Sequence, residues 1–140
     1  MAESPGRAFA DTNVLIYSVE DEGVKRRRAL EALAAQPVVV ISAQVVAEFV
    51  NAGLRKKLAP PDEIRRIALR YLDTYPVVPN DEAVLRRGLQ YHERYGLQWW
   101  DALVVAAAVE ARCPTLYSED MQDGQEIDGT TIVNPFPATV

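Results

Sequence analysis

Four acidic side chains stand where a folded chain could bring them together: Asp11, Glu48, Asp101 and Asp120. Asp11 directly follows the apolar segment 8–10, and Asp120 lies three residues beyond the apolar segment 115–117. Carboxylate oxygens are the ligands that Mg²⁺ and Mn²⁺ prefer in proteins. These residue types at these positions therefore indicate a site that binds a divalent cation.

The surroundings of two of the acids favour the same chemistry. Asp101 shares a predicted helix face with Val104 and Val105, and Glu48 shares one with Val45. Such faces point inward, and a buried carboxylate is costly unless its charge is compensated. No Lys or Arg lies within a helical turn of Asp101. A divalent cation would supply the missing positive charge.

Taken singly, the acids have ordinary structural interpretations. Asp11 could be no more than a helix cap, a role that Asp often fills. Glu48 could be a solvated helix residue, and Asp101 could be placed by the helix dipole. Because each interpretation is reasonable alone, the argument for a shared site depends on where the elements place the acids.

Asp120 has close competitors. It could be an ordinary turn acid, and Glu119 and Asp123 are equally well placed by spacing. The spacing alone leaves all three open. Asp11 and the Asp120 segment nevertheless both follow predicted strands, which favours a common site.

Short apolar segments alternating with helices must position these acids. Strands are predicted at 8–10, 38–41, 115–117 and 131–133, and helices at 26–35, 43–55, 64–72, 80–95 and 101–109. Residues 14–17 could extend the first strand or begin a helix, and Val77–Val78 could be an edge strand or an extended link. This alternation predicts one α/β domain over residues 1–140, with a mostly parallel sheet. Ligands of such sheets bind beyond the carboxyl ends of the strands.

Individual positions follow from local rules. Ser42 and Asn80 are expected to cap helices, and Gly96 is expected to follow the end of one. Helical spacing predicts that Leu85 and Leu89 point inward together with Val84. The same spacing assigns Ile64, Ile67, Ala68, Tyr71 and Leu72 to the inner stripe of the preceding helix.

Composition limits the classes of protein. The chain has 140 residues and a formal net charge of -5, which argues mildly against a simple nucleic-acid-binding module but less against a metal-dependent nuclease. The single Cys113 excludes an internal disulfide and is expected to be buried, and the single His92 excludes a histidine-based zinc site. We see no secretory signal and no apolar run long enough for a bilayer, so a cytoplasmic protein is expected.

Four sequence blocks, in order, resemble the motifs of the PIN-domain family. They are Asp11-Thr12-Asn13-Val14-Leu15-Ile16-Tyr17, Ser42 with Glu48, Trp100-Asp101-Ala102-Leu103, and Ser118-Glu119-Asp120-Met121 with Asp123-Gly124. The length and the closing residues 132–136 are similar to those of VapC toxins from bacterial toxin–antitoxin pairs. The resemblance covers nearly the whole chain.

The resemblance implies a three-layer α/β/α fold and a Mg²⁺- or Mn²⁺-dependent endoribonuclease. It implies that Asp11, Glu48, Asp101 and Asp120 hold the metal, which activates a water for in-line attack on an RNA phosphodiester. It assigns supporting roles to Thr12, Asn13, Ser118 and Asp123. It also implies a homodimer and a VapB-like antitoxin partner, with Leu30, Leu33 and Val46 as candidate antitoxin contacts.

Residues that contact RNA are less well defined. The basic clusters are 25–28, 55–57 and 86–87, and each is more often a solvated helix face than a phosphate site. Tyr91, Tyr95, Trp99 and Trp100 could stack on bases, but core or dimer contacts are at least as common. The sequence does not choose among these residues.

Two other functions compete. A haloacid-dehalogenase-like phosphatase would need a second acid two residues after Asp11, where this chain has Asn13. A catalytically silent PIN-like module that binds RNA or a protein would not need all four acids. The complete acid set therefore favours the nuclease.

Overall fold

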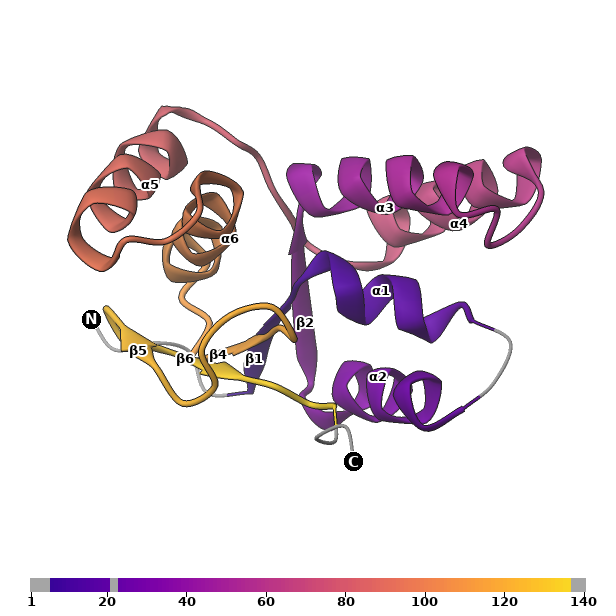
Figure 1. Cartoon of the computed structure of the whole chain (residues 1–140), viewed down its shortest axis with the longest axis horizontal. Coiled ribbons are helices and arrows are strands. Elements are labelled where there is room, and N and C mark those ends of the chain that lie inside the picture. Colours follow the sequence, from indigo (N-terminus) through magenta and orange to yellow (C-terminus); the bar gives the residue numbers. More distant parts are fainter. Residues whose placement is uncertain (1–5, 21–22, 137–140) are drawn as a thin grey trace.

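The computed structural model describes residues 6–20 and 23–136, and within them six strands form one sheet (Figure 1). The strands are β1 (Arg7–Ala10), β2 (Val38–Ser42), β3 (Val77–Val78), β4 (Thr115–Tyr117), β5 (Glu126–Ile127) and β6 (Thr130–Val133). The helices are α1 (Thr12–Ser18), α2 (Val24–Ala35), α3 (Ala43–Arg55), α4 (Pro61–Thr74), α5 (Glu82–Tyr95) and α6 (Trp99–Glu110).

The sheet has the order β3-β2-β1-β4-β6-β5, and only β5 runs antiparallel to its neighbour. Phe9 of β1 is in register with Val40 of β2 and Leu116 of β4, and Leu116 is in register with Ile132 of β6. All four side chains are fully buried, as expected for central strands that are covered on both faces. The predicted mostly parallel sheet is confirmed.

Helices cover the sheet on two sides. Figure 1 shows α5 and α6 on one side of β1 and β2, with α1 and α2 on the other. The helices α3 and α4 pack against each other, and α3 also contacts α1. This is the three-layer α/β/α arrangement, and it places the carboxyl ends of β1, β2 and β4 beside α1, α3 and α6.

The segment after β1 is a helix, which resolves the alternative left open by the sequence. Asp11 is the N-cap of α1, and its carboxylate accepts a hydrogen bond from the Thr12 backbone N–H. Ser42 caps α3 as predicted, since its hydroxyl accepts a 3.1 Å hydrogen bond from the Val45 N–H. Helices α1 and α3 each begin directly after a strand, so their polar N-caps, Asp11 and Ser42, lie at the carboxyl ends of β1 and β2.

The helix α5 differs from its prediction. Its N-cap is Asp81 rather than Asn80, and Leu85 and Leu89 are 40% and 59% exposed rather than inward. The buried face instead contains Gly88, where an added Cβ would lie 2.8 Å from Leu103 of α6. Val84 points inward as predicted, but a count of apolar residues could not find Gly88, whose missing side chain lets α6 approach closely.

Other expectations were also wrong in detail. Leu72 of α4 is exposed rather than inward. Val46, expected at a contact surface, is only 6% exposed and belongs to the core, whereas Leu30 is exposed. The helix α6 begins at Trp99, which leaves Asp101 in its first turn. The two-residue strand β5 was not predicted, because it is too short for a periodic pattern.

Three further expectations concern single positions and segments. Gly96 is the left-handed residue that ends α5, with φ of 65°, as predicted. Cys113 is buried, and burial raises the pKa of its thiol to about 11. In the described part of the chain, every helix is too short or too polar to span a membrane.

Candidate active site

Asp11 lies at the centre of the candidate site, at the junction of β1 and α1. Its Oδ1 accepts a 2.7 Å hydrogen bond from the Thr12 N–H, and its Oδ2 accepts one of 2.8 Å from the Ser118 hydroxyl. Burial raises the pKa of Asp11 to about 7; the two hydrogen bonds oppose this rise, and the charges of Asp101 and Glu48 add to it. A side chain only 5% exposed therefore carries a charge that the protein compensates poorly.

Glu48 is held in the second turn of α3. Its Oε1 accepts a 2.7 Å hydrogen bond from the Thr12 hydroxyl, and its Oε2 accepts a long one of 3.5 Å from the Gln44 side chain. The Gln44 amide also donates to the backbone carbonyl of Trp100, 3.2 Å away. Glu48 is half-buried, so it is not a freely solvated helix residue. Glu48 thereby joins α3 to α1, and Gln44 joins α3 to α6.

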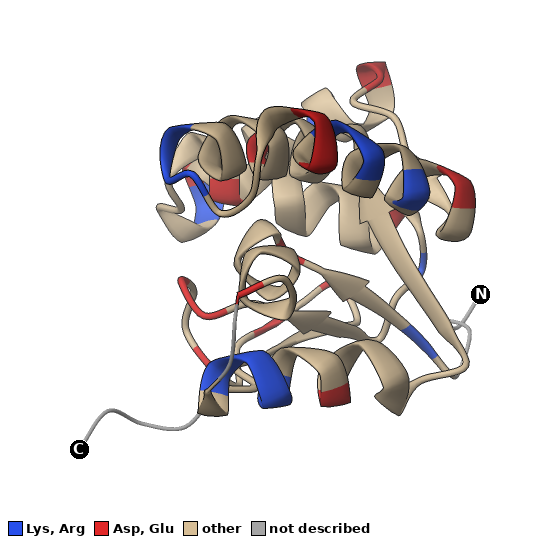
Figure 2. Ribbon diagram, turned by 90° about the vertical axis from the view of Figure 1, so that its right-hand side faces the viewer, with Lys and Arg blue, Asp and Glu red and all other residues tan. Residues whose placement is uncertain are grey.

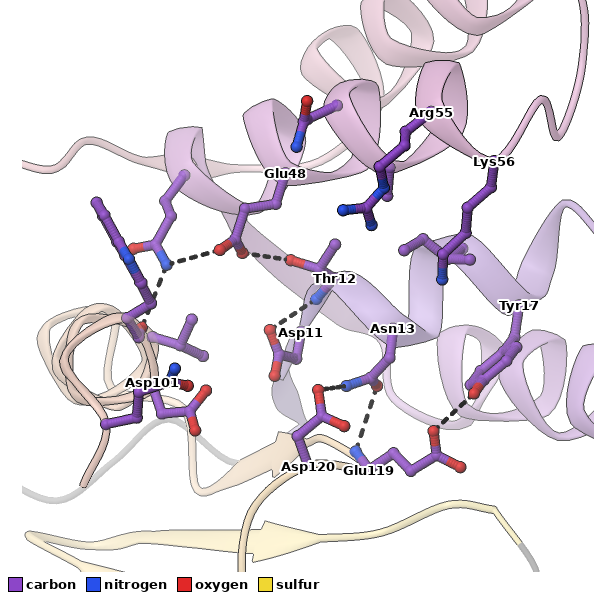
Figure 3. Close-up of a pocket in the computed structure, with 17 residues that line it drawn as sticks. Asp11, Thr12, Asn13, Tyr17, Glu48, Arg55, Lys56, Asp101, Glu119 and Asp120 are labelled. Carbon is purple, nitrogen blue, oxygen red and sulfur yellow. Dashed lines mark hydrogen bonds between the residues drawn. The ribbon is translucent and has the colours of Figure 1, made fainter. Parts of the chain in front are cut away.

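Asp101 projects from the first turn of α6 into the same space (Figure 3). Burial raises its pKa, and the nearby charges of Asp120 and Glu48 raise it further. Among the residues that the structure describes, none donates a hydrogen bond to this carboxylate. The side chain is half-buried and has no partner of its own, as its apolar helix face predicts.

Asp120 is the most exposed of the four acids, and Asn13 holds it. The Asn13 amide donates a 3.1 Å hydrogen bond to Asp120 Oδ2, and its oxygen accepts one of 3.3 Å from the Glu119 backbone N–H. The Ser118 hydroxyl accepts a further hydrogen bond of 3.2 Å from the Asp120 N–H. The segment after β4 is thereby fixed to α1.

The structure separates Asp120 from the two acids that competed with it. The Glu119 carboxylate forms an ion pair with Lys25 and accepts a 2.7 Å hydrogen bond from the Tyr17 hydroxyl. Burial acts to raise the pKa of Glu119, but these two partners outweigh it and the pKa lies below its usual value. Asp123 accepts a 2.8 Å hydrogen bond from the Asn134 N–H and does not line the cavity.

One cavity of ≈ 440 Å³ joins these residues. Its lining includes the four predicted carboxylates together with Thr12 and Asn13, and also Glu119, whose charge is paired with Lys25 (Figure 3). Ser118 lies behind it, bonded to Asp11. The structure therefore brings together seven of the eight residues named from the sequence and leaves out Asp123.

The acids share a cavity but do not touch a common point. Within residues 6–20 and 23–136, no three His, Cys, Asp or Glu side chains lie close enough together to hold one ion directly. Mg²⁺ usually takes only one or two carboxylates and keeps several waters. Carboxylate oxygens spaced around an open cavity are compatible with such an ion, because its bound waters can bridge to the acids that do not contact it directly.

The sequence did not identify three residues as partners of these acids: Gln44, Tyr17 and Lys25. Gln44 is buried and bonds Glu48 and the backbone of Trp100; its only signal was the four-residue spacing from Glu48. Tyr17 and Lys25 neutralise Glu119 across more than ninety residues of chain, and no local pattern reveals such a pair.

In a comparison with protein families, the model of the PIN domain matches residues 8–123. That range spans all four acids and both helices that follow β1 and β2. No curated protein has a sequence that matches this chain.

Several solved structures share the fold. A toxin–antitoxin complex from Klebsiella pneumoniae has 25% identity and a TM-score of 0.72, covering 94% of this chain and 99% of that one. The sarcin–ricin-loop-cleaving toxin VapC20 of Mycobacterium tuberculosis has 19% identity and a TM-score of 0.68, covering 81% and 89%. VapBC2 of Rickettsia felis, bound to promoter DNA, has 17% identity and a TM-score of 0.65, covering 90% and 96%.

Proposed function

Because this chain belongs to the PIN domain family, we propose that it is a divalent-metal-dependent endoribonuclease with the four-acid cavity as its active site. The observation that carries the proposal is the meeting of four carboxylates, from four separate elements, around one cavity. The proposed metal ligands are Asp11, Glu48, Asp101 and Asp120, and Mg²⁺ is the proposed ion, with Mn²⁺ as a substitute.

The charge balance of the cavity supports a bound cation. The pKa values of Asp11 and Asp101 are raised by burial and by neighbouring carboxylates. No Lys or Arg in the described residues forms an ion pair with any of the four acids. Their donor atoms are all oxygens, which suit Mg²⁺ and Mn²⁺ rather than zinc.

The residues around the acids have distinct roles in this proposal. Thr12 orients Glu48 through its hydroxyl and Asp11 through its backbone N–H. Ser118 fixes the second oxygen of Asp11, and Asn13 orients Asp120. When bound, the ion lowers the pKa of a water and stabilises the charge that develops on the phosphate. The expected products carry a 5′-phosphate and a 3′-hydroxyl.

We also propose that the protein is the toxin of a toxin–antitoxin pair. The support is the toxin–antitoxin complex from Klebsiella pneumoniae. The alignment with one chain of that complex covers 94% of this chain and 99% of the matched chain. Exposed leucines offer surfaces for a protein partner: Leu69 and Leu72 on α4, and Leu85 and Leu89 on α5. We propose that these surfaces serve self-association into a homodimer and binding of a VapB-like antitoxin.

Mn²⁺ binding and RNA cleavage, measured on the same variants, test the nuclease proposal. We expect Asp101→Asn to abolish cleavage and to weaken Mn²⁺ binding while the protein stays folded. Asp73→Asn is the matched control, because Asp73 is exposed on α4 and outside the cavity. Cleavage by Asp101→Asn at the wild-type rate would overturn the proposal. Absence of cleavage and of Mn²⁺ binding in the wild type would instead favour the silent binding module.

A further inference from the structure

The cavity is electrically polarised along its length. Arg55 and Lys56, at the end of α3, are the basic residues that line it within the described part of the chain. Figure 3 shows their side chains reaching toward the cavity, across from Asp101. They follow Glu48 by two helical turns, a rise of about 10 Å. Neither forms an ion pair with a described residue, so their charges are available to an anionic ligand.

The structure distinguishes this pair from the other basic residues. Figure 2 shows Lys and Arg spread over several helices, so their positions must be separated by what each contacts. At the start of α2, Lys25 is paired with Glu119, and Arg26 and Arg27 line a separate hollow. Arg86 and Arg87 form ion pairs with Glu82 and Glu110. Among the described basic residues, Arg55 and Lys56 alone line the cavity of the carboxylates and form no ion pair.

Among the four candidate aromatics, Trp100 has the exposure and the position to meet a ligand. It is 53% exposed, lines the cavity and precedes Asp101 on α6. Its backbone is held by Gln44. Tyr91, by contrast, is buried with its hydroxyl bonded to Asp128, and Trp99 packs beside Gly88 of α5.

We propose that Arg55 and Lys56 bind a backbone phosphate beside the bond that is cut, and that Trp100 stacks on an unpaired base across the acids. This assignment rests on the proposed function, because it takes the acids as the place of cleavage. A base inside a duplex has both faces covered by its neighbours, so stacking on Trp100 requires a single-stranded segment. The Trp100 contact is therefore accessible to an unpaired stretch of RNA and not to a helix.

Binding without cleavage tests the proposal. A labelled ten-residue oligouridylate and a ten-base-pair RNA duplex are titrated in EDTA against Asp101→Asn, which removes one repelling carboxylate and, under the proposed function, the reaction. Trp100→Ala and Arg55→Gln with Lys56→Gln are added to this background. The matched controls are Trp100→Phe, which keeps a stacking ring, and Lys57→Gln, because Lys57 lines a different hollow beside Leu54 and Pro60.

We expect tighter binding of the oligouridylate than of the duplex. Trp100→Ala should weaken oligouridylate binding between about 5-fold and 150-fold, with Trp100→Phe near the parent. Loss of both cations should reduce the slope of log affinity against log salt by roughly 1.4, whereas Lys57→Gln leaves it unchanged. Equal binding of the duplex, or unchanged affinity and slope in these variants, would overturn the proposal. Cleavage by the wild type is measured separately, so either result stands apart from the nuclease proposal.

Discussion

The hydroxyl of Thr12 donates a 2.7 Å hydrogen bond to Glu48, while the backbone N–H of the same residue donates a 2.7 Å hydrogen bond to Asp11. One residue thereby orients two proposed metal ligands from two different helices. Substitution at Thr12 can remove the first contact without the second, since only the first uses the side chain. This gives a direct way to measure what positioning contributes.

We expect Thr12→Val to weaken Mn²⁺ binding by about 10-fold to 100-fold, the usual effect of losing a residue that orients a ligand. The isosteric side chain keeps the volume, and the Asp11 contact from the backbone remains. Thr12→Ser retains the hydroxyl and should restore binding. Calorimetric titration of the three proteins checks this, and equal affinities for Thr12→Val and wild type would contradict it.

The raised pKa of Asp11 predicts how stability depends on pH. The folded carboxyl titrates at about 7 instead of 3.8, so between these values the unfolded chain loses a proton that the folded protein keeps. The Asp11 contribution to the free energy of unfolding therefore falls as pH rises, by about 2–3 kcal/mol between pH 5 and pH 8.

Urea unfolding in EDTA at the two pH values measures this contribution as the difference between wild type and Asp11→Asn. The wild type should lose more stability than the variant on going to pH 8. Adding Mg²⁺ at pH 8 should recover stability in the wild type, because a cation favours the ionised form. A parallel pH response in both proteins would show that Asp11 is not the cause.

The ion pair between Lys25 and Glu119 predicts an effect on the neighbouring acid. Lys25→Gln leaves the Glu119 carboxylate without its ion-pair partner beside Asp120. It also removes one of the two contacts that hold residues 119–120, and the contact with Asn13 remains. We expect Mn²⁺ affinity to change several-fold while thermal stability shifts little, since Lys25 is partly exposed. Arg26→Gln is the adjacent control. A change in melting temperature with no change in metal affinity would indicate a purely structural role.

The exposed leucines of α5 are predicted to form the interface of the proposed homodimer. Leu85→Glu with Leu89→Glu places two charges on an apolar strip that the core does not use. We expect light scattering to give the mass of a dimer for the wild type and of a monomer for the variant, with unchanged circular dichroism. Leu69→Glu with Leu72→Glu on α4 serves as the comparison. A dimeric α5 variant would exclude these two leucines from the interface.

The sequence was sufficient for the parts of the fold that depend on local patterns. The central strands were predicted because Val38–Ile41 and Thr115–Tyr117 are continuous apolar runs, and Asp11 and Asp101 were noticed because acids followed or entered such runs. Their shared cavity then followed from the geometry of parallel sheets. The family resemblance preferred Asp120 over Glu119, and the structure adds a physical reason.

That reason, and the errors, come from long-range contacts. The charge of Glu119 is compensated by Lys25, which lies 94 residues earlier in the chain. No sequence pattern links the two residues. Leu85 and Leu89 were assigned to the core because they are apolar, whereas the true contact face uses Gly88 to admit Leu103. Apolar periodicity indicates which helix faces can be buried, but it does not indicate which element packs against them.

The position of Asp11 as the N-cap of α1 matters for anyone who needs an inert version of this protein. Asp11→Ala removes a helix cap, which typically contributes about 1 kcal/mol, together with a charge, so abundance in a cell changes along with activity. Asp101 carries no comparable scaffold duty. If the proposed toxin role holds, an inactive reference variant for growth assays is better made at Asp101, where a loss of toxicity would report the loss of the proposed reaction.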